Sequence, residues 1–255
     1  MTANKTSKLV WLTSPGTAPF FDLYHAVREA EGRVQSPESL RSLPSVQTDH
    51  PHFQEWRIRA ESARLLVADL KSRCAKRVLE LGCGNGWLSF YLAQHLEASV
   101  CGLDQSIPEL EMAVQVFGEQ PNLQFAYGDV LDPQFPNQSY DQIVLASCIQ
   151  YFSDKAQLLG ALLALLAPGG QIHLIDSPVY TLDERPKAKA RSKAYYAELG
   201  FPEMADHYHP CSLHELAPFQ PQYRYRPSRL QRFLARLSGK PFRPFPWLVL
   251  EREHD

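Results

Sequence analysis

Short apolar runs alternate with helical patterns over residues 77–175, and this alternation is the strongest signal in the chain. The run at 78–81 is apolar and ends at a glycine, which is typical of a fully buried strand in a parallel sheet. Similar runs predict further strands at 98–103, 123–127, 141–146 and 171–175. Apolar residues at helical spacing predict helices at 88–96, 107–117 and 154–167. Alternating strands and helices favour parallel pairing through right-handed crossovers.

The flanking segments have weaker patterns. Before residue 50, apolar islands at 10–12 and 20–27 are separated by prolines, which predicts short helices and loops. A broad apolar face at 52–74 predicts a longer helix. Towards the other end, 222–226 and 247–250 are predicted to form an antiparallel hairpin that adds the sixth and seventh strands.

The alternation is interrupted at residues 177–220, where a basic run becomes helical near Ala188 and ends at Gly200, a residue suited to a helix C-cap. We therefore predict an α/β protein with a doubly wound, mostly parallel, seven-stranded sheet. Its expected parts are an N-terminal helical extension over residues 1–75 and a main domain over residues 76–255, with the 177–220 segment inserted after the fifth strand.

Composition narrows the classes of function. The 255 residues are enough for one α/β domain with a substantial core, and a formal charge of −2 argues against a general nucleic-acid binder. Five cysteines without close pairing fit free thiols in a reducing cytosol. No apolar run reaches membrane-spanning length, and residues 1–8 lack the apolar block of a signal peptide. These features predict a soluble cytoplasmic protein.

The turn after the first strand carries the clearest chemical signal. Residues 80–86 read E-x-G-x-G-x-G, and a helix is expected to begin directly after them. The glycines permit a tight turn and close approach of a ligand to the backbone, while the helix N-terminus directs N–H groups at that ligand. The dinucleotide fingerprint would need a glycine where Trp87 stands. A carboxylate at Glu80 suits a cationic ligand better than a pyrophosphate.

The stretch VLELGCGNG at 78–86 resembles the first motif of the class I S-adenosylmethionine-dependent methyltransferases, in particular the type 11-like, small-molecule branch. The resemblance continues in family order to Asp176 and implies a Rossmann-like methyltransferase fold with S-adenosylmethionine as cofactor. It implies that the glycine turn holds the amino-acid end of the cofactor. The cofactor-binding residues that it implies are Glu80, Gly82, Cys83, Gly84, Gly86, Asp104, Gln105, Asp129, Val130 and Ser147.

Two of these residues have an alternative role. By resemblance, Asp104 binds the ribose hydroxyls, and Asp129, with the backbone of Val130, faces the adenine amino group. Asp104 could instead cap the helix that follows it, because aspartate is a common capping residue at a strand end. Asp129 could be a turn residue after Gly128.

The methyl end of the cofactor needs a dry, uncharged environment. Ile149, Tyr151 and Phe152 could provide it, or could pack in the core. On the 52–74 helix, Trp56 or Arg57 could contact the cofactor carboxylate or the substrate, while the simpler expectation is a core tryptophan and a solvated arginine. The sulfonium is already an activated donor, so alignment and exclusion of water are the main requirements and no catalytic residue is marked.

The expected acceptor is a small molecule with an O, N or C nucleophile. The segment at 147–150 reads SCIQ instead of the DPPY-type motif of enzymes that methylate nucleic-acid bases or glutamine. A general base is needed only for a protonated acceptor, and His207, His209 or His214 could serve. These histidines do not predict a metal site, because no third ligand stands at a familiar spacing. The acceptor atom and the oligomeric state carry no sequence signal.

A dehydrogenase is a weaker alternative. Tyr151 and Lys155 have the Y-x-x-x-K spacing of short-chain dehydrogenases, in which the pair lies within a long helix. Here the pair straddles a predicted helix start at Asp154, and the spacing of the glycine turn differs as well.

The chain is locally basic near its end. Residues 220–250 contain seven basic and no acidic residues, and the helix predicted at 228–238 has leucines and a phenylalanine on one face and arginines on the other. The simplest expectation is a surface helix packed on the sheet with its arginines in water. The same pattern could give weak contact with anionic lipid or with a phosphorylated partner. A non-catalytic cofactor-binding or docking protein on this fold is therefore the alternative to an enzyme.

Overall fold

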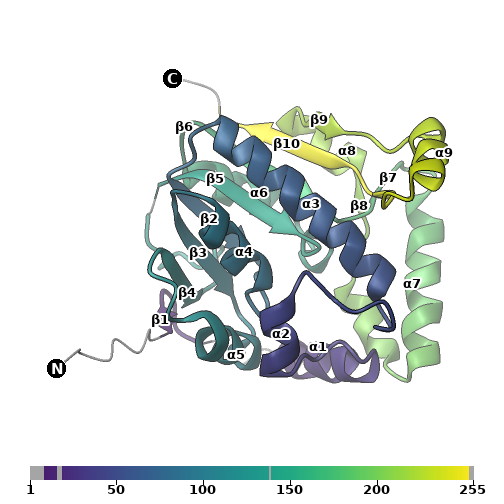
Figure 1. The fold of residues 1–255 in the computed structure, drawn as a ribbon, viewed down its shortest axis with the longest axis horizontal. Coiled ribbons are helices and arrows are strands. Elements are labelled where there is room, and N and C mark those ends of the chain that lie inside the picture. Colours follow the sequence, from purple (N-terminus) through teal and green to yellow (C-terminus); the bar gives the residue numbers. More distant parts are fainter. Residues whose placement is uncertain (1–8, 16–18, 138, 253–255) are drawn as a thin grey trace.

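A single eight-stranded sheet runs through the molecule (Figure 1) in this computed structural model, which describes residues 9–15, 19–137 and 139–252. Only β10 is antiparallel to its neighbours, β6 and β9; the other pairs in this sheet are parallel. In spatial order the strands are β1 (Val10–Trp11), β4 (Leu123–Tyr127), β3 (Ser99–Asp104), β2 (Arg77–Leu81), β5 (Tyr140–Ala146), β6 (Leu166–Ile175), β10 (Trp247–Glu251) and β9 (Gln222–Tyr225).

The eighth strand is β1, which the sequence did not predict. Its two residues pair in parallel with the edge strand β4, and the Leu12 N–H donates to Tyr127 O at 2.9 Å. The Trp11 and Tyr127 rings lie 4.8 Å apart. A two-residue strand has no alternation that could identify it. The seven predicted strands are all present, and β1 is an additional edge strand. The predicted count of seven strands is therefore one too low.

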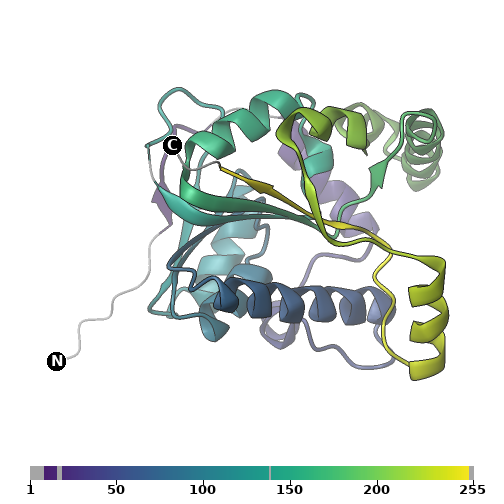
Figure 2. The same ribbon diagram turned by 90° about the horizontal axis from the view of Figure 1, so that it is seen from above.

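Helices cover both faces of the sheet (Figure 2). One face carries α3 (Phe53–Ser72), α4 (Trp87–His95) and α5 (Ile107–Phe117), and the other carries α6 (Lys155–Ala164) and the short α8 (Leu213–Leu216). Their apolar faces and the buried strands form two core clusters, one on each side of the sheet. No helix in the described ranges is long and apolar enough to span a bilayer.

The boundary between α6 and β6 differs from the prediction. The helix was expected to reach residue 167, but it ends at Ala164, and β6 begins at Leu166, before the Pro-Gly-Gly turn. The reason is pairing with β5, because the Tyr140 N–H donates to Leu165 O at 2.9 Å and Tyr140 lies opposite Leu166. A long-range pairing of this kind has no local signal.

The N-terminal segment covers the carboxyl end of the sheet. It contains α1 (Pro19–Ala30) and α2 (Pro37–Ser42), as well as β1, so the expectation of helices and loops alone was incomplete. Val27 of α1 packs against Tyr196 and Met204, which belong to the segment after β6. A segment that precedes the glycine turn in the sequence and a segment that follows it thus meet over the carboxyl ends of the strands.

The segment after β6 forms a separate layer. Val179–Tyr180 (β7) pairs with Cys211–Ser212 (β8), and between them lie α7 (Arg185–Leu199) and a 3₁₀ turn, η2 (Pro202–His207). The predicted end of α7 is confirmed, because Gly200 takes a left-handed conformation there. Its start is three residues earlier than predicted because Pro186 fits the first turn of a helix.

The last helix, α9 (Arg229–Ser238), lies at the end of the molecule and not on the sheet (Figure 2). Ser228 caps it, with the Gln231 N–H donating to Ser228 Oγ at 3.2 Å, and the left-handed Gly239 ends it. Its apolar residues are exposed, so the expectation of a helix packed on the sheet by that face is wrong.

The turn between β2 and α4 depends on glycine at position 86. Gly86 has φ 76° and precedes α4. A Cβ at this position would lie 2.4 Å from Cε1 of Phe125, whose side chain is buried. Both the left-handed backbone and the close approach therefore exclude a side chain here.

The variant Gly86→Ala should lower the free energy of unfolding by about 2–3 kcal/mol, from the left-handed penalty and the clash with Phe125. The matched control is Gly160→Ala within α6, where a Cβ would have no atom within 4 Å. That change should raise stability by about 0.5–1 kcal/mol. Urea unfolding measures both. Wild-type stability in Gly86→Ala would contradict this account of the turn.

Candidate functional site

A cavity of about 560 Å³ lies at the carboxyl ends of the parallel strands. Its walls come from the glycine turn, the ends of β3 and β5, α1 and the start of α3. Most of the residues predicted to bind the cofactor line it: Glu80, Gly82, Cys83, Gly84, Asp104, Gln105, Asp129 and Ser147. Gly86 and Val130 lie outside the lining, and the Val130 side chain packs in the core.

Glu80 is a buried carboxyl group on this wall. Glu80 lies near the carboxyl end of β2 with its side chain buried, and Ser89 Oγ donates to Glu80 Oε2 at 2.5 Å. Burial, more than the neighbouring Asp104, raises the pKa of Glu80 to about 8. Near neutral pH the buried position therefore favours a protonated Glu80, and a cation beside it would favour the carboxylate.

Asp104 joins three backbone segments. Its Oδ2 accepts from the Gly84 N–H at 2.7 Å, and its Oδ1 accepts from the N–H groups of Gln105 and Ser106 at 2.7 and 2.8 Å. Gln105 and Ser106 precede Ile107, the first residue of α5, so Asp104 orders the turn before this helix and does not cap it; its side chain also lies on the cavity wall. Burial raises the pKa of Asp104 even against these three hydrogen bonds.

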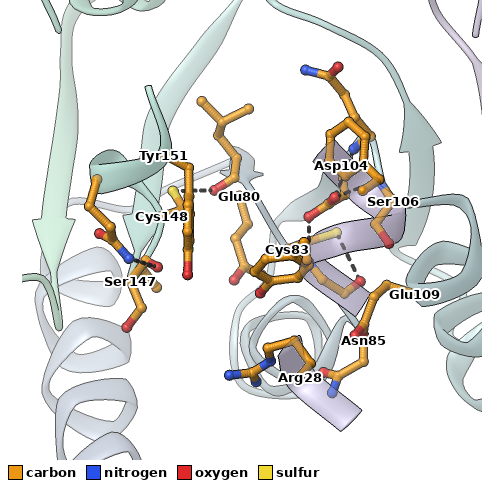
Figure 3. A pocket seen from close by; sticks show the side chains of 18 of the residues that line it. Arg28, Glu80, Cys83, Asn85, Asp104, Ser106, Glu109, Ser147, Cys148 and Tyr151 are labelled. Carbon is orange, nitrogen blue, oxygen red and sulfur yellow. Dashed lines mark hydrogen bonds between the residues drawn. The ribbon is translucent and has the colours of Figure 1, made fainter. Parts of the chain in front are cut away.

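A third carboxyl group was not predicted. Glu109, in the first turn of α5, lines the cavity near Gly84, and burial followed by the charge of Asp104 raises its pKa. Glu80, Asp104 and Glu109 thus form an acidic wall around the turn. Figure 3 shows Asp104 and Glu109 on one side of the cavity, with Ser147 and Tyr151 on the opposite side. Sequence spacing could have identified Glu109, because α5 begins shortly after Asp104 and Glu109 lies in its first turn.

Asp129 and Ser147 both have local hydrogen-bonding roles. Asp129 Oδ1 accepts from the Leu131 N–H at 2.9 Å, so the turn role considered for it is also present. Ser147 has φ 58°, and its Oγ donates to Asp176 O at 2.9 Å. A left-handed non-glycine residue at a strand end is a feature that tertiary structure must hold in place.

A group of aromatic side chains also lines the cavity. Phe20 and Tyr24 of α1 meet Tyr151 of the 3₁₀ turn η1 (Ile149–Tyr151), with the Tyr24 and Tyr151 rings edge to face at 5.4 Å. Of the residues expected around the methyl group, Tyr151 and Phe152 line the cavity, while Ile149 is buried in the core. Nothing in the local pattern of 20–27 predicts its approach to Tyr151.

The cationic side chains of the cavity differ from the prediction. Arg57 does not line it, because its Nη2 donates to Gly239 O at 2.6 Å. Arg59, on the same helix face as Trp56, lines the cavity and pairs with Glu55 at 2.9 Å. Helical spacing of three from Trp56 could have identified it. Arg28 also lines the cavity, and its Nε is buried without a hydrogen-bond partner among the described residues.

The histidines of the segment after β6 stand back from the cavity. His207 packs on Phe20 with ring centroids 5.0 Å apart, and the His209 N–H donates to Gln150 O at 2.7 Å. The histidine that lines the cavity is His52, before α3. In the described ranges, no group of three or more His, Cys, Asp or Glu side chains could hold a metal ion.

Lys155 has a structural role. Its Nζ donates to Phe152 O and to His209 O, which holds the segment after β6 against the start of α6. Lys155 is the first residue of α6, so Tyr151 and Lys155 do not share a helix as the dehydrogenase pair does.

Comparison with known proteins matches residues 78–170 to a family model described as a methyltransferase domain. Phosphoethanolamine N-methyltransferase 3 of Arabidopsis thaliana is 27% identical over 117 residues, which cover 46% of this chain and 24% of that protein. Trans-aconitate 2-methyltransferase of Deinococcus radiodurans is 37% identical over 115 residues, covering 44% of this chain and 42% of that protein. The chain thus spans less than half the length of these relatives.

Among solved structures, phosphoethanolamine N-methyltransferase 2 of Haemonchus contortus, in complex with S-adenosyl-L-methionine, has a TM-score of 0.58. It is 16% identical, and the match covers 94% of this chain and 61% of that one. At this identity the likeness concerns the fold.

The Glu80 carboxyl group should make stability depend on pH. Between about pH 4.5 and 8 the folded protein keeps a proton that the unfolded chain releases, so rising pH destabilises the fold. Glu80→Gln keeps an acceptor for Ser89 and removes the ionisation. Its stability relative to wild type should therefore increase by roughly 1–3 kcal/mol from pH 5 to pH 8. Urea unfolding at several pH values tests this, and a difference independent of pH would refute it.

Proposed function

We propose that the protein is a class I S-adenosylmethionine-dependent methyltransferase that binds S-adenosylmethionine and transfers its methyl group to a small-molecule O, N or C nucleophile. The match of residues 78–170 to a methyltransferase domain supports this proposal. The observation that carries the proposal is that the acidic wall at the glycine turn and a group of aromatic side chains line one cavity. A cation fits there, because it compensates buried carboxyl groups and can meet ring faces.

In this proposal the cofactor-binding residues keep the roles expected from the resemblance. The turn from Glu80 to Gly86 holds the amino-acid end, and Asp104 with Gln105 holds the ribose. Asp129 with the Val130 backbone faces the adenine amino group, and Ser147 lies in the segment next to the methyl group. The free capacity of Asp104 supports its role, since Oδ2 accepts from the Gly84 N–H alone and has room for a hydroxyl donor.

The side chains contribute alignment and exclusion of water. S-adenosylmethionine, when bound, supplies a methyl group that its sulfonium has already activated. Phe20, Tyr24 and Tyr151 keep water from this end, and the packing of α1 against Tyr151 fixes the direction from which a nucleophile approaches. We name no catalytic base, because an acceptor with a free lone pair needs none.

Arg28, which lines the cavity from α1, supports binding of an anionic group there. Its Nε is buried and unpartnered in the described part of the chain, and its Nη1 reaches Glu31 only at 3.5 Å. A carboxylate would satisfy this guanidinium through charge-assisted hydrogen bonds. We assign Arg28 to the carboxylate of the cofactor or of the acceptor.

The proposal also covers the organisation and location of the protein. We treat residues 1–75 as a cover over the cofactor cavity and residues 76–255 as the methyltransferase domain, with the 177–220 insertion on its substrate side. The five cysteines are all unpaired, which supports a cytoplasmic location.

The second candidate is a non-catalytic cofactor-binding or docking protein. The observation in its favour is that the histidines considered as bases, His207, His209 and His214, do not line the cavity. Binding measurements with both cofactor forms, followed by a screen of acceptors, separate the two candidates, because only the enzyme converts S-adenosylmethionine into S-adenosylhomocysteine.

Calorimetry should detect S-adenosylmethionine and S-adenosylhomocysteine at micromolar affinity and NAD(H) not at all. Asp104→Asn should weaken binding at least about tenfold, because the ribose loses a charged acceptor. The asparagine keeps one acceptor for the backbone N–H groups, which an alanine would not. The control is Asp132→Asn, since Asp132 accepts from the Gln134 N–H at 2.7 Å outside the cavity. Equal affinity in the Asp104 and Asp132 variants, or preference for NAD(H), would overturn the proposal.

A further inference from the structure

Helix α9 exposes a compact apolar face. The exposed fractions of Leu230, Phe233, Leu234 and Leu237 are 66%, 57%, 52% and 70%. They are four of the nine large apolar side chains that are exposed in the described ranges, and they come from one ten-residue helix. Single exposed apolar residues are ordinary, but a contiguous patch marks a contact surface.

The helix divides into three faces. At about 100° per residue, the four apolar side chains span an arc of about 100°. Arg229, Arg232 and Arg236 form the neighbouring arc and are exposed. The third face, with Gln231, Ala235 and Ser238, borders a groove shared with Glu61 and Leu65 of α3, and Leu234, at the edge of the apolar face, borders the same groove. The side of α9 that faces the protein is therefore mainly its small and polar side, while every residue of the apolar face remains more than half exposed.

This orientation is held by contacts at both ends of α9. Ser228 and Gln231 form a reciprocal cap, in which the Ser228 N–H also donates to Gln231 Oε1 at 2.9 Å. At the other end, Arg57 of α3 donates to Gly239 O at 2.6 Å. The helix is thus anchored to α3 with its apolar face outward.

The charge around this face is of one sign. Residues 220–250 include seven basic residues and no acidic residue, although the whole chain has a net charge of −2. Within the described ranges, Arg229, Arg232 and Arg236 have no carboxylate within 4 Å. Arg232 lies over the Phe242 ring at 5.2 Å, a contact that leaves its charge without an anionic partner. The three guanidinium groups can therefore contact an anionic surface beside the apolar face.

We propose that α9 is an interfacial helix that seats the protein on an anionic phospholipid bilayer. The leucines and Phe233 enter the boundary between headgroups and acyl chains, and the arginines contact the lipid phosphates. Pairing of two copies through this face explains the observations less well, because two-fold symmetry would bring arginines together with no acidic residue of the helix between them.

The position of α9 fits such a contact. It precedes β10, which runs antiparallel to β6, so it leaves the sheet at the edge formed by the carboxyl ends of the parallel strands. In Figures 1 and 2, α9 lies at one end of the molecule, where it projects beyond the sheet. A flat surface can therefore reach its outer face. This inference is independent of the proposed function, because it involves no residue of the cavity.

The test is sedimentation of the full chain, without cofactor, with phosphatidylcholine vesicles that contain or lack phosphatidylserine. Phosphatidylserine should raise the bound fraction at least about tenfold, and added salt should reverse this. Phe233→Ser with Leu237→Ser should lower binding at least about tenfold without a change in melting temperature, because both side chains are exposed in the free protein.

Charge variants separate α9 from general basicity. Removing three charges by Arg229→Gln, Arg232→Gln and Arg236→Gln should abolish the preference for phosphatidylserine. Removing three from α7 by Lys187→Gln, Lys189→Gln and Lys193→Gln, all exposed, should leave it nearly unchanged. Failure to bind phosphatidylserine vesicles, or equal losses in the two sets, would overturn the proposal. So would a dimer in solution that the Phe233 and Leu237 changes dissociate, which would make this face a protein interface.

Discussion

The site depends on the hydrogen bonds that the Asp104 carboxylate accepts from the backbone. By accepting N–H groups from Gly84 on one oxygen and from Gln105 and Ser106 on the other, it ties the glycine turn to the end of β3 and to the start of α5. These three segments form one wall of the cavity. The left-handed Gly86 then allows α4 to begin close to Phe125. The geometry of the site therefore follows from one carboxylate and one glycine.

The electrostatic state of the cavity explains why it should bind a cation. Glu80, Asp104 and Glu109 are brought together where burial raises the pKa of each. Burying several like charges together is unfavourable, and a positive ligand beside them offsets this cost. Tyr24 and Tyr151, which line the same cavity, present ring surfaces that require no counter-charge. Burial in the folded protein thus favours the protonated form of these carboxyl groups, whereas binding of a cation favours their ionised form.

The sequence predicted the elements whose signal is local. Buried parallel strands are apolar along their length, which identifies β2 to β6, while alternation in β9 and an apolar run in β10 identify the antiparallel pair. Helix α5 and strand β4 have the predicted bounds. Features that arise from tertiary contact were missed. The edge strand β1 is too short for a pattern, and the approach of α1 to Tyr151 joins segments more than 100 residues apart. For α9, amphipathicity predicted an apolar face but not what covers it.

The most direct test of the account is the number of protons exchanged when S-adenosylmethionine binds. Calorimetric titrations at pH 7 in buffers of different ionisation enthalpy give this number. Because Glu80 is protonated in the free protein, with a pKa of about 8, and a bound cation favours the carboxylate, wild type should release roughly 0.5–1 proton. Glu80→Gln should bind without this release. Binding by wild type with no release of protons, or with uptake, would contradict the role of the acidic wall.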